Sequence, residues 1–308
     1  MRYILLGGNG YYGRNFQCFL MAEGNSTANE IIVIDKEITV QFKGITYVQY
    51  NLTHFTDSLY SSLNLKKSSQ NTTIINFAAI SFVDDSILNP DECINNNVKC
   101  LESAIQLYET MSDESYVKLI HISTDEVNVI KPNSEKSPYV KSKLMCEDIL
   151  RNSEGINYTI LRPVNLMGYC HDLKCKELRQ ANECLLKKIS DKPDVVYIHG
   201  SGCQRRMFMN MTDACETLYS ISIDDFGDSE KTFNIVDITD YPLLRTSNLQ
   251  IKDIIIYLSN SDKYHFKYVY VDDPRGKYQD QSYLKGESEI LTKIDSDLKK
   301  IKDCIWGR

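Results

Sequence analysis

The chain of 308 residues is long enough for one large α/β domain, or for a large and a small one. Its 42% hydrophobic and 25% charged residues are ordinary for a globular protein, and no apolar run approaches the roughly 20 residues that cross a membrane. The net charge of -7 argues against a nucleic-acid-binding protein but leaves room for a small anionic ligand in a local basic pocket.

The ten cysteines raise the question of disulfides or metal. The N-terminus becomes glycine-rich after a short apolar run, unlike a signal peptide, so we expect reduced thiols and a cytoplasmic protein. Cys170, His171, Cys175 and Cys184 lack the paired C-x-x-C spacing of common zinc sites. We therefore expect no metal.

Apolar runs alternate with longer amphipathic stretches through the first half of the chain. We expect buried strands at residues 2–8, 30–35, 45–52, 73–79, 117–124 and 158–165, and helices at residues 13–24, 91–111 and 138–155. Continuous Ile, Val and Leu runs between helices predict an α/β fold, a Rossmann-type doubly wound parallel sheet.

The pattern loosens after about residue 165, where shorter strands are expected at residues 194–200 and 266–271. We therefore expect residues 1–165 to form a dinucleotide-binding Rossmann domain. Residues 166–308 are expected to form mainly a smaller C-terminal substrate-binding domain, with some segments returning to the first domain.

A glycine-rich loop separates the first strand from the first helix. Gly7, Gly10 and Gly13 would allow a tight turn and close approach to a pyrophosphate, which the helix N-terminus also favours. Asp35 ends the second strand, where a carboxylate binds the adenosine ribose and repels a 2′-phosphate, so NAD is favoured over NADP. An ordinary strand–helix turn and a strand-ending Asp stay open as alternatives, and the adjacent Lys36 weakens the preference.

Tyr139 and Lys143 stand four residues apart, so on a helix they share one face. A lysine in that place stabilises phenolate, which lowers the pKa of the tyrosine and makes it a base. The alternative is an exposed helix face on which a cation lies beside an aromatic ring.

Thr124, Asp125 and Glu126 follow the fifth expected strand. Adjacent carboxylates repel each other, so the triplet is either a solvated turn or a set of groups that act together in catalysis. The order of the motifs favours catalysis, because the triplet stands between the glycine loop and the Tyr139/Lys143 pair.

Together these motifs resemble the extended short-chain dehydrogenase/reductase family, and within it the nucleotide-sugar 4,6-dehydratases. Four segments carry the resemblance: residues 76–98, 123–127, 161–169 and 200–214. Relatives that only epimerise C4 usually carry a serine-rich motif in place of Thr124-Asp125-Glu126, so the triplet discriminates best. The resemblance implies NAD, a dTDP- or UDP-hexose substrate with glucose as the leading sugar, and a homodimer.

The resemblance also implies roles for the catalytic residues. Tyr139 would take the C4 hydroxyl proton while NAD accepts the C4 hydride, with Thr124 bonding that oxygen and Lys143 keeping Tyr139 anionic and bonding the nicotinamide ribose. Glu126 would then remove the C5 proton, and a protonated Asp125 would help the C6 hydroxyl leave as water before the hydride returns to C6. One carboxylate must be a base and its neighbour an acid, which closeness and partial burial can arrange.

Further site residues are implied by their places in the matched segments. Ala78 and Asn97 are implied on the cofactor side, together with Tyr139 and Lys143. Ser81, Asp84, Asn165, Arg206 and Arg275 are implied on the substrate side. For the arginines, a solvated surface charge is the alternative.

Two other activities stay open: a nucleotide-sugar 4-epimerase or reductase of the same family, and a non-catalytic subunit that binds NAD or a nucleotide sugar. Tyr139 lies only thirteen positions after Glu126, a shorter connection than in typical retaining dehydratases. Inverting UDP-N-acetylhexosamine dehydratases have a short connection but usually carry Lys in place of Glu126. The sugar and the stereochemistry at C5 are therefore open.

Overall fold

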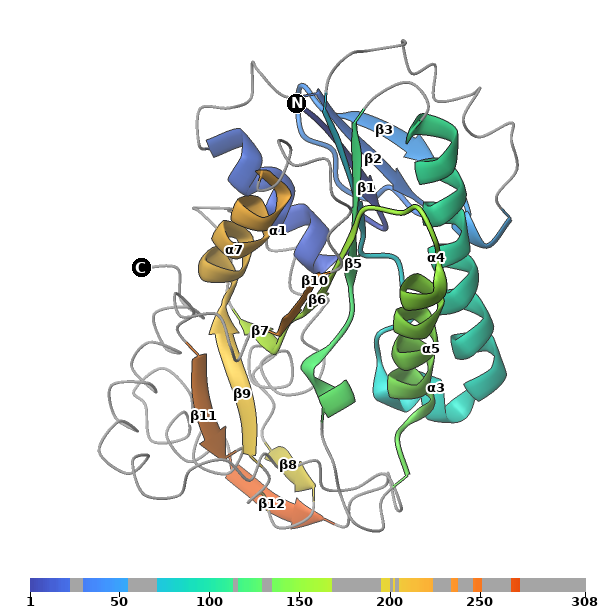
Figure 1. Cartoon of the computed structure of the whole chain (residues 1–308). Helices are drawn as coiled ribbons and strands as arrows, with labels where there is room; N and C mark the ends of the chain where they lie inside the picture. Colours follow the sequence, from blue (N-terminus) through green and yellow to red (C-terminus); the bar gives the residue numbers. More distant parts are fainter. Residues whose placement is uncertain are drawn as a thin grey trace.

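The computed structural model describes residues 1–22, 30–54, 71–112, 116–128, 135–167, 195–199, 202, 205–223, 234–237, 246–250 and 267–271. Its centre is a seven-stranded parallel sheet with the order β10-β6-β5-β4-β1-β2-β3 (Figure 1). The strands are β1 (Arg2–Leu6), β2 (Glu30–Asp35), β3 (Thr46–Gln49), β4 (Thr72–Asn76), β5 (Val117–Ile122), β6 (Tyr158–Arg162) and β10 (Asn234–Asp237). The strand order reverses between β1 and β4, so this is the predicted Rossmann-type fold.

Helices cover both faces of this sheet (Figure 1). On one face lie α1 (Tyr11–Ala22) and α7 (Met211–Ile223), and on the other lie α3 (Val83–Leu88), α4 (Pro90–Ser112) and α5 (Pro138–Asn152). Crossover helices on both faces bury every central strand, which explains why the strands are apolar throughout rather than alternating.

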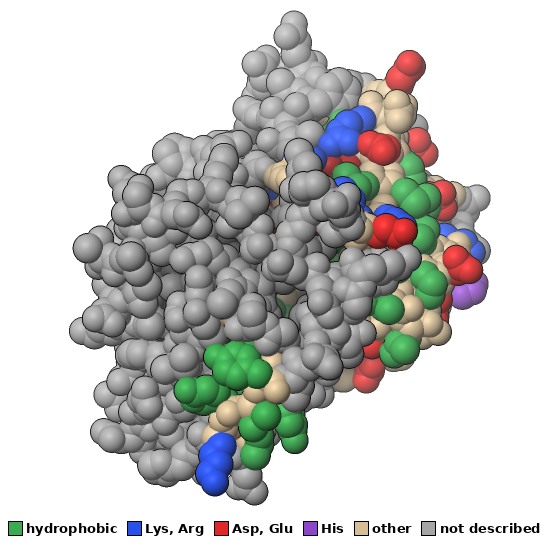
Figure 2. All heavy atoms as spheres, turned by 90° about the horizontal axis from the view of Figure 1, so that it is seen from below, with side chains coloured by type: hydrophobic (Ala, Val, Ile, Leu, Met, Phe, Trp, Pro, Cys, Tyr) green, Lys and Arg blue, Asp and Glu red, His purple; other side chains and the backbone are tan. Residues whose placement is uncertain are grey.

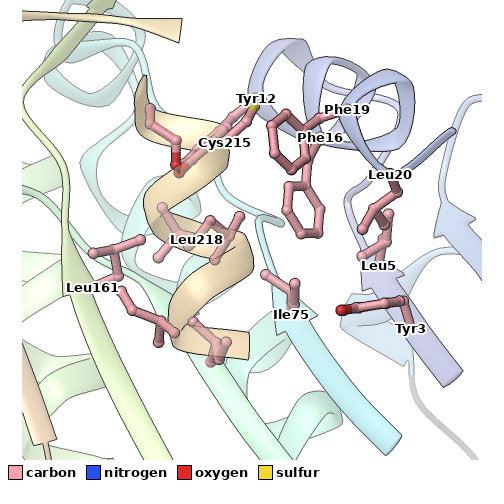
Figure 3. Close-up of a cluster of buried hydrophobic side chains, with 14 of the residues drawn as sticks. Tyr3, Leu5, Tyr12, Phe16, Phe19, Leu20, Ile75, Leu161, Cys215 and Leu218 are labelled. Atoms are coloured by element: carbon pink, nitrogen blue, oxygen red, sulfur yellow. Dashed lines mark hydrogen bonds between the residues drawn. The ribbon is translucent and has the colours of Figure 1, made fainter. Parts of the chain in front are cut away.

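Successive side chains of β1 enter two separate hydrophobic cores. Tyr3 and Leu5 belong to the core beneath α1 and α7, whereas Ile4 and Leu6 belong to the core beneath α4 and α5. Figure 3 shows the first core, in which Phe16 of α1 and other aromatic and aliphatic side chains fill the space between the two helices and the sheet. The period of two along a strand thus places each side chain in one core or the other.

Two smaller sheets follow the central one in the sequence. β7 (Asn165–Met167), β9 (Arg205–Asn210) and β11 (Thr246–Gln250) form one of them, and β8 (Val195–His199) pairs with β12 (Lys267–Val271) in the other. On β8 and β12, the side chains of Tyr197 and Tyr270 are 54% and 49% exposed. Figure 2 shows several hydrophobic side chains at the surface of the described residues. Two short 3-10 helices, η2 (Leu52–His54) and η3 (Asp125–Asn128), complete the described elements.

The expected strands of the first half are present, with ends that local chemistry explains. The first strand stops at Leu6 because Gly7 has a φ of 68° and starts the turn. The expected strand 158–165 is two strands, since β6 ends at Arg162 and β7 begins at Asn165. Pro163 between them has no N–H to continue a ladder.

Two elements beyond residue 165 contact the central sheet or its helices. β10 pairs in parallel with β6 at the sheet edge, and Leu218 of α7 shares a core with Phe16 of α1. Neither α7 nor β10 has a counterpart among the expected elements. The division of the chain at residue 165 stays a prediction. Among the described helices, none has the length and apolar character to cross a membrane.

Candidate functional site

Most of the predicted site residues that the structure describes lie at the carboxyl edge of the central sheet. Gly7 follows β1, Ala78 follows β4, Thr124 follows β5 and Asn165 follows β6. Parallel α/β sheets bind ligands outside the carboxyl ends of their strands, beside the point where the strand order reverses. The topology therefore brings together residues that are far apart in the sequence.

The glycine loop is closely packed at two positions and open at the third. A Cβ on Gly7 would lie 2.5 Å from the Ala78 Cα, and a Cβ on Gly13 would lie 2.5 Å from the Gly8 carbonyl oxygen. Gly10 is exposed, and a Cβ there would meet the Gly7 oxygen at 3.3 Å. The open surface at Gly10, directly before the N-terminus of α1, fits a pyrophosphate that binds helix N–H groups.

Asp35 lies beside this loop at the end of β2. Its Oδ2 accepts a hydrogen bond from the Asn9 backbone N–H at 2.9 Å. Burial raises the pKa of Asp35, while the N–H groups of Asn9 and Glu37 act in the opposite direction. A carboxylate at this place fits the ribose hydroxyls of an adenosine, so the loop and Asp35 together fit the ADP half of NAD.

The side chain of Asn9 ties the segment after β2 to the glycine loop. Its Oδ1 accepts hydrogen bonds from the Thr39 N–H at 2.9 Å and from the Arg14 Nη2 at 2.8 Å, and its Nδ2 donates to the Val40 carbonyl at 2.7 Å. These contacts hold the segment after β2 against the glycine loop, next to the expected cofactor site. None of the four residues was predicted as a site residue.

The triplet of Thr124, Asp125 and Glu126 is largely buried rather than solvated. Thr124 is 7% exposed and Asp125 is 3% exposed, whereas Glu126 is partly exposed. The Thr124 Oγ1 accepts the Glu126 N–H at 3.3 Å, and the Asp125 N–H donates to the Pro163 carbonyl at 3.1 Å. These bonds form the turn η3 and hold it against the chain that follows β6.

Helix α5 places Tyr139 and Lys143 opposite this turn. Ser137 caps the helix by accepting the Val140 N–H at 3.3 Å, and Pro138 fits the first helical position. The Lys143 ammonium group is buried, donates to the Ile122 carbonyl at 2.7 Å and lies 6.0 Å from the centroid of the Tyr139 ring. Burial lowers the pKa of Lys143.

The phenol of Tyr139 interacts with all three residues of the triplet. Burial raises the pKa of Tyr139 most, the carboxylate charge of Glu126 raises it further, a hydrogen bond with Thr124 lowers it, and the charge of Asp125 raises it. The prediction of a lowered pKa for Tyr139 is therefore wrong for the protein without cofactor, in which this pKa is raised. The physical reason is that burial disfavours the charged phenolate most, and the nearby carboxylates of Glu126 and Asp125 disfavour it further.

Asn97 of α4 contacts protein groups in a buried position. Its side chain is 1% exposed, its Oδ1 accepts the Ile80 N–H at 2.7 Å, and its Nδ2 donates to the Ser142 hydroxyl at 2.8 Å. Asn97 thus links the loop after β4 to α5. These contacts shape the loop that follows β4 on the cofactor side.

The remaining predicted residues are placed as follows. Ala78 donates its N–H to the Asn76 Oδ1 at 3.1 Å, close to Gly7. Ser81, Asp84 and Asn165 are exposed, in the loop before α3, the first turn of α3 and β7 respectively. The backbone of Arg206 lies in β9, but its side chain is outside the described part of the chain, as is all of Arg275.

The four Cys and His residues considered for zinc also lie outside the described residues. Within the part of the chain that the structure describes, no group of three His, Cys, Asp or Glu side chains could hold a metal ion. None of the five buried cysteines in that part forms a disulfide: Cys18, Cys93, Cys100, Cys146 and Cys215.

A polar network that the sequence analysis did not identify lies behind the triplet. The Ser123 hydroxyl donates to the Glu147 Oε1 at 2.6 Å, the Arg162 Nε donates to the same oxygen at 2.9 Å, and the Arg162 Nη1 donates to the Asn128 Oδ1 at 2.9 Å. One signal was available, because Glu147 continues the four-residue spacing of Tyr139 and Lys143 on α5. Its partner Arg162 lies in the matched segment 161–169, but that match did not indicate the contact with Glu147.

Comparisons with known proteins agree with this geometry. Residues 3–235 match the model of the NAD dependent epimerase/dehydratase family. The UDP-glucose 4-epimerase of Streptococcus mutans serotype c is 27% identical over 181 residues, which cover 54% of this chain and 53% of that protein. The dTDP-glucose 4,6-dehydratase of Mycolicibacterium smegmatis is 23% identical over 247 residues, which cover 73% of this chain and 69% of that protein.

A solved dTDP-glucose 4,6-dehydratase from Streptomyces venezuelae, with NAD bound, has the same fold with a TM-score of 0.69. It is 21% identical, and the alignment covers 98% of this chain and 96% of that one. The chain spans about half the length of the first curated relatives that it matches. The similarity thus includes both epimerases and dehydratases.

Proposed function

Because this chain belongs to the NAD-dependent epimerase/dehydratase family, we propose that it is a nucleotide-sugar 4,6-dehydratase that acts on a dTDP- or UDP-hexose, with glucose as the first sugar to test. The observation that carries this proposal is the interaction of the Tyr139 phenol with Thr124, Asp125 and Glu126. Inversion of configuration at C4 needs a base that removes the proton of the C4 hydroxyl. Removal of water from C5 and C6 needs two further acid–base groups beside the same carbon chain.

Oxidation at C4 is the first step of the proposed reaction. NAD, the cofactor of the family, would be held by the glycine loop and Asp35 and would supply the hydride acceptor for C4 and the hydride donor for C6. Tyr139 takes the proton of the C4 hydroxyl, and Thr124, which is hydrogen-bonded to the phenol, orients the reacting oxygen. Lys143 supplies a buried positive charge on the same helix face, 6.0 Å from the tyrosine ring.

Elimination of water is the second step. The 4-ketone acidifies the C5 proton, which Glu126 removes, and the C6 hydroxyl leaves as water with a proton from Asp125. Asp125 is 3% exposed and Glu126 is partly exposed, so their environments differ in the direction that a buried acid and a more solvated base require. The hydride then adds to C6 while a proton returns to C5, so the net reaction is the loss of one water.

The raised pKa of Tyr139 fits a base that works only when a cation is close. Oxidised nicotinamide carries a positive charge, which favours phenolate. Without such a cation, burial and the two carboxylates favour the neutral phenol, which can hold its proton during the elimination. The electrostatics of the triplet thus support a sequence in which Tyr139 acts first and the carboxylates second.

A C4 epimerase is the second candidate, because relatives that the chain resembles carry the name UDP-glucose 4-epimerase. Such a reaction uses the base at C4 and returns the hydride to the same carbon. It gives no role to a group that removes the C5 proton. The two candidates therefore differ in the products that they predict and in their dependence on Glu126.

The experiment is to incubate the purified protein and NAD with a panel of UDP-, dTDP-, GDP- and CDP-hexoses and analyse the products by mass spectrometry. A dehydratase gives a product that is lighter by one water, in the form of a 4-keto-6-deoxy sugar. A product of unchanged mass and inverted C4 supports the epimerase instead. Bound NAD with no turnover across the panel would contradict both and favour a binding subunit.

A further inference from the structure

A single arginine side chain binds both the turn η3 and the helix α5. Arg162, the last residue of β6, binds Glu147 of α5 with its Nε and Nη2 and binds the Asn128 Oδ1 of η3 with its Nη1 at 2.9 Å. A guanidinium group presents N–H donors along two edges, so one side chain can hold two elements at a fixed distance.

The helix end of this connection is rigid. The Glu147 side chain is fully buried and also binds the Ser123 hydroxyl at 2.6 Å and the Arg151 Nη2 at 2.6 Å. Burial alone would raise the pKa of Glu147, but the hydrogen bonds and charges of these partners hold it below its usual value. Glu147 is thus an anion that fixes Arg162 in place.

Glu147 also fixes the orientation of α5 about its own axis, and with it the direction in which the Tyr139 side of the helix faces. Tyr139, Lys143 and Glu147 follow one another at intervals of four residues, so they lie on one side of α5. A contact that locates Glu147 relative to β6 therefore locates Tyr139 as well.

The turn end of the connection is at the surface. Asn128 is exposed and is the last residue of η3, whose first two residues are Asp125 and Glu126. The same turn is held from the other side by Lys136, whose Nζ donates to the Val127 carbonyl at 2.7 Å. Both contacts act on the end of η3 away from Thr124, and they add to the backbone bonds of Asp125 and Glu126 that hold the start of the turn.

We propose that Arg162 is a positioning residue for water elimination, holding the Asp125/Glu126 turn in register with the Tyr139 helix through Asn128 on one side and Glu147 on the other. The inference rests on the proposed dehydratase function. C4 oxidation depends on α5 and Thr124, whereas elimination also depends on where η3 presents its carboxylates. A misplacement of about 1 Å can cost roughly a hundredfold in rate, so a contact distant from the chemistry can matter.

Asn128→Ala is the sharpest test, because it removes the acceptor on the turn and leaves the buried Glu147–Arg162 pair intact. In single-turnover experiments, we expect water loss to slow about tenfold, as for loss of one charge-assisted hydrogen bond. C4 oxidation should keep its rate, so the reduced cofactor accumulates visibly before product forms. We expect KM to stay close to that of the wild type, since neither residue is placed against the substrate.

Asn128→Asp keeps an acceptor for Arg162 and should restore the wild-type partition between oxidation and elimination. Asn152→Ala is the matched control, because Asn152 is also exposed and donates only to the Asp148 carbonyl at the end of α5 among its described contacts. It should behave as the wild type.

Wild-type elimination rates in Asn128→Ala would overturn the inference and leave the dehydratase function standing. Equal slowing of oxidation and elimination, or failure of Asn128→Asp to restore the partition, would also overturn it, since either result indicates general loosening. A wild-type protein that yields only a C4 epimer would overturn the proposed function, and this inference with it.

Discussion

On the cofactor side of the site, the chain uses its backbone: Gly7 and Gly13 allow contacts that any Cβ would prevent, and Gly10 leaves the N-terminus of α1 open. On the acid–base side, it uses side chains from β5, η3, α5 and β6 that meet in a buried network. The first kind of site depends on a few consecutive residues. The second depends on several distant elements holding one another in place, so it offers more ways to alter the reaction without unfolding the protein.

The largest effect should come from Tyr139→Phe, which removes the group that takes the C4 proton. We expect kcat to fall by about 10²–10⁴, because that is the usual contribution of a positioned acid–base group. Cofactor binding should be retained, since the glycine loop is unchanged. The measurement is turnover on the substrate that the panel identifies, together with the NAD content of the purified protein.

Tyr108→Phe is the matched control for this change. Tyr108 is a buried tyrosine of α4 whose hydroxyl accepts the Asn157 N–H at 2.9 Å, so the same atom is lost at a purely structural place. It should lower stability slightly and leave kcat unchanged. A Tyr139→Phe protein as active as the wild type would remove Tyr139 from the mechanism.

The next effect separates the two steps within the acid–base side. Glu126→Gln keeps the shape of the side chain but removes the base for C5, so we expect product formation to fall by about 10²–10³ while C4 oxidation continues. Reduced cofactor should then accumulate in a single turnover. Glu109→Gln, at an exposed position of α4, is the control for the loss of one negative charge.

The same variant decides between the candidate functions. An epimerase would lose little activity on replacement of Glu126, because its reaction has no step at C5. Retention of wild-type turnover in Glu126→Gln would therefore contradict the dehydratase and favour the epimerase.

The cofactor side can be tested with two glycines that differ in their surroundings. Gly13→Ala places a Cβ against the Gly8 carbonyl oxygen, so we expect a loss of about 1–3 kcal/mol in the free energy of unfolding. Gly10→Ala brings a Cβ to 3.3 Å from the Gly7 oxygen, a milder crowding, so it should lose less stability than Gly13→Ala but bind NAD more weakly. Thermal unfolding and NAD titration measure the two effects separately. Equal destabilisation by both changes would show that the distinction between a packed and an open glycine is wrong.

The features that the sequence predicts differ in the same way between the cofactor side and the acid–base side. The strands and the glycine loop are predictable because their signals are local: Ile, Val and Leu runs for β1 to β6, and three glycines with Asp35 for the cofactor side. The triplet and the Tyr139/Lys143 pair are also visible as short motifs. Spacing places Lys143 near Tyr139, but it cannot say that the ammonium group donates to the Ile122 carbonyl. The direction of the tyrosine pKa was wrong because spacing also cannot show the burial of the phenol and the two carboxylates beside it, which raise that pKa.

The rest could not be predicted because it depends on contacts between distant segments. Arg162 and Asn128 are 34 residues apart in the sequence, and Ser123 and Glu147 are 24 apart. No period or local propensity encodes such a pair. The return of some later segments to the first domain was expected, but the sequence did not identify α7 and β10 as those segments.

The smallest effect is a pH dependence of stability that the buried network should impose. The pKa of Glu147 is lower in the folded protein than its ordinary value, because Arg162 and Ser123 bind the charged form despite burial. A lowered folded pKa means that the stabilisation is complete above the pKa of the unfolded chain, about 4.3, and is lost as the pH falls through the lower folded value. Chemical unfolding at a series of pH values should therefore show the free energy of unfolding declining below that point.

Glu147→Gln should be less stable at neutral pH and show a shallower acid decline, because a neutral amide keeps a shape similar to the carboxylate but no longer titrates. An acid decline as steep in Glu147→Gln as in the wild type would mean that other carboxylates carry it, and that the network behind the triplet contributes to geometry alone.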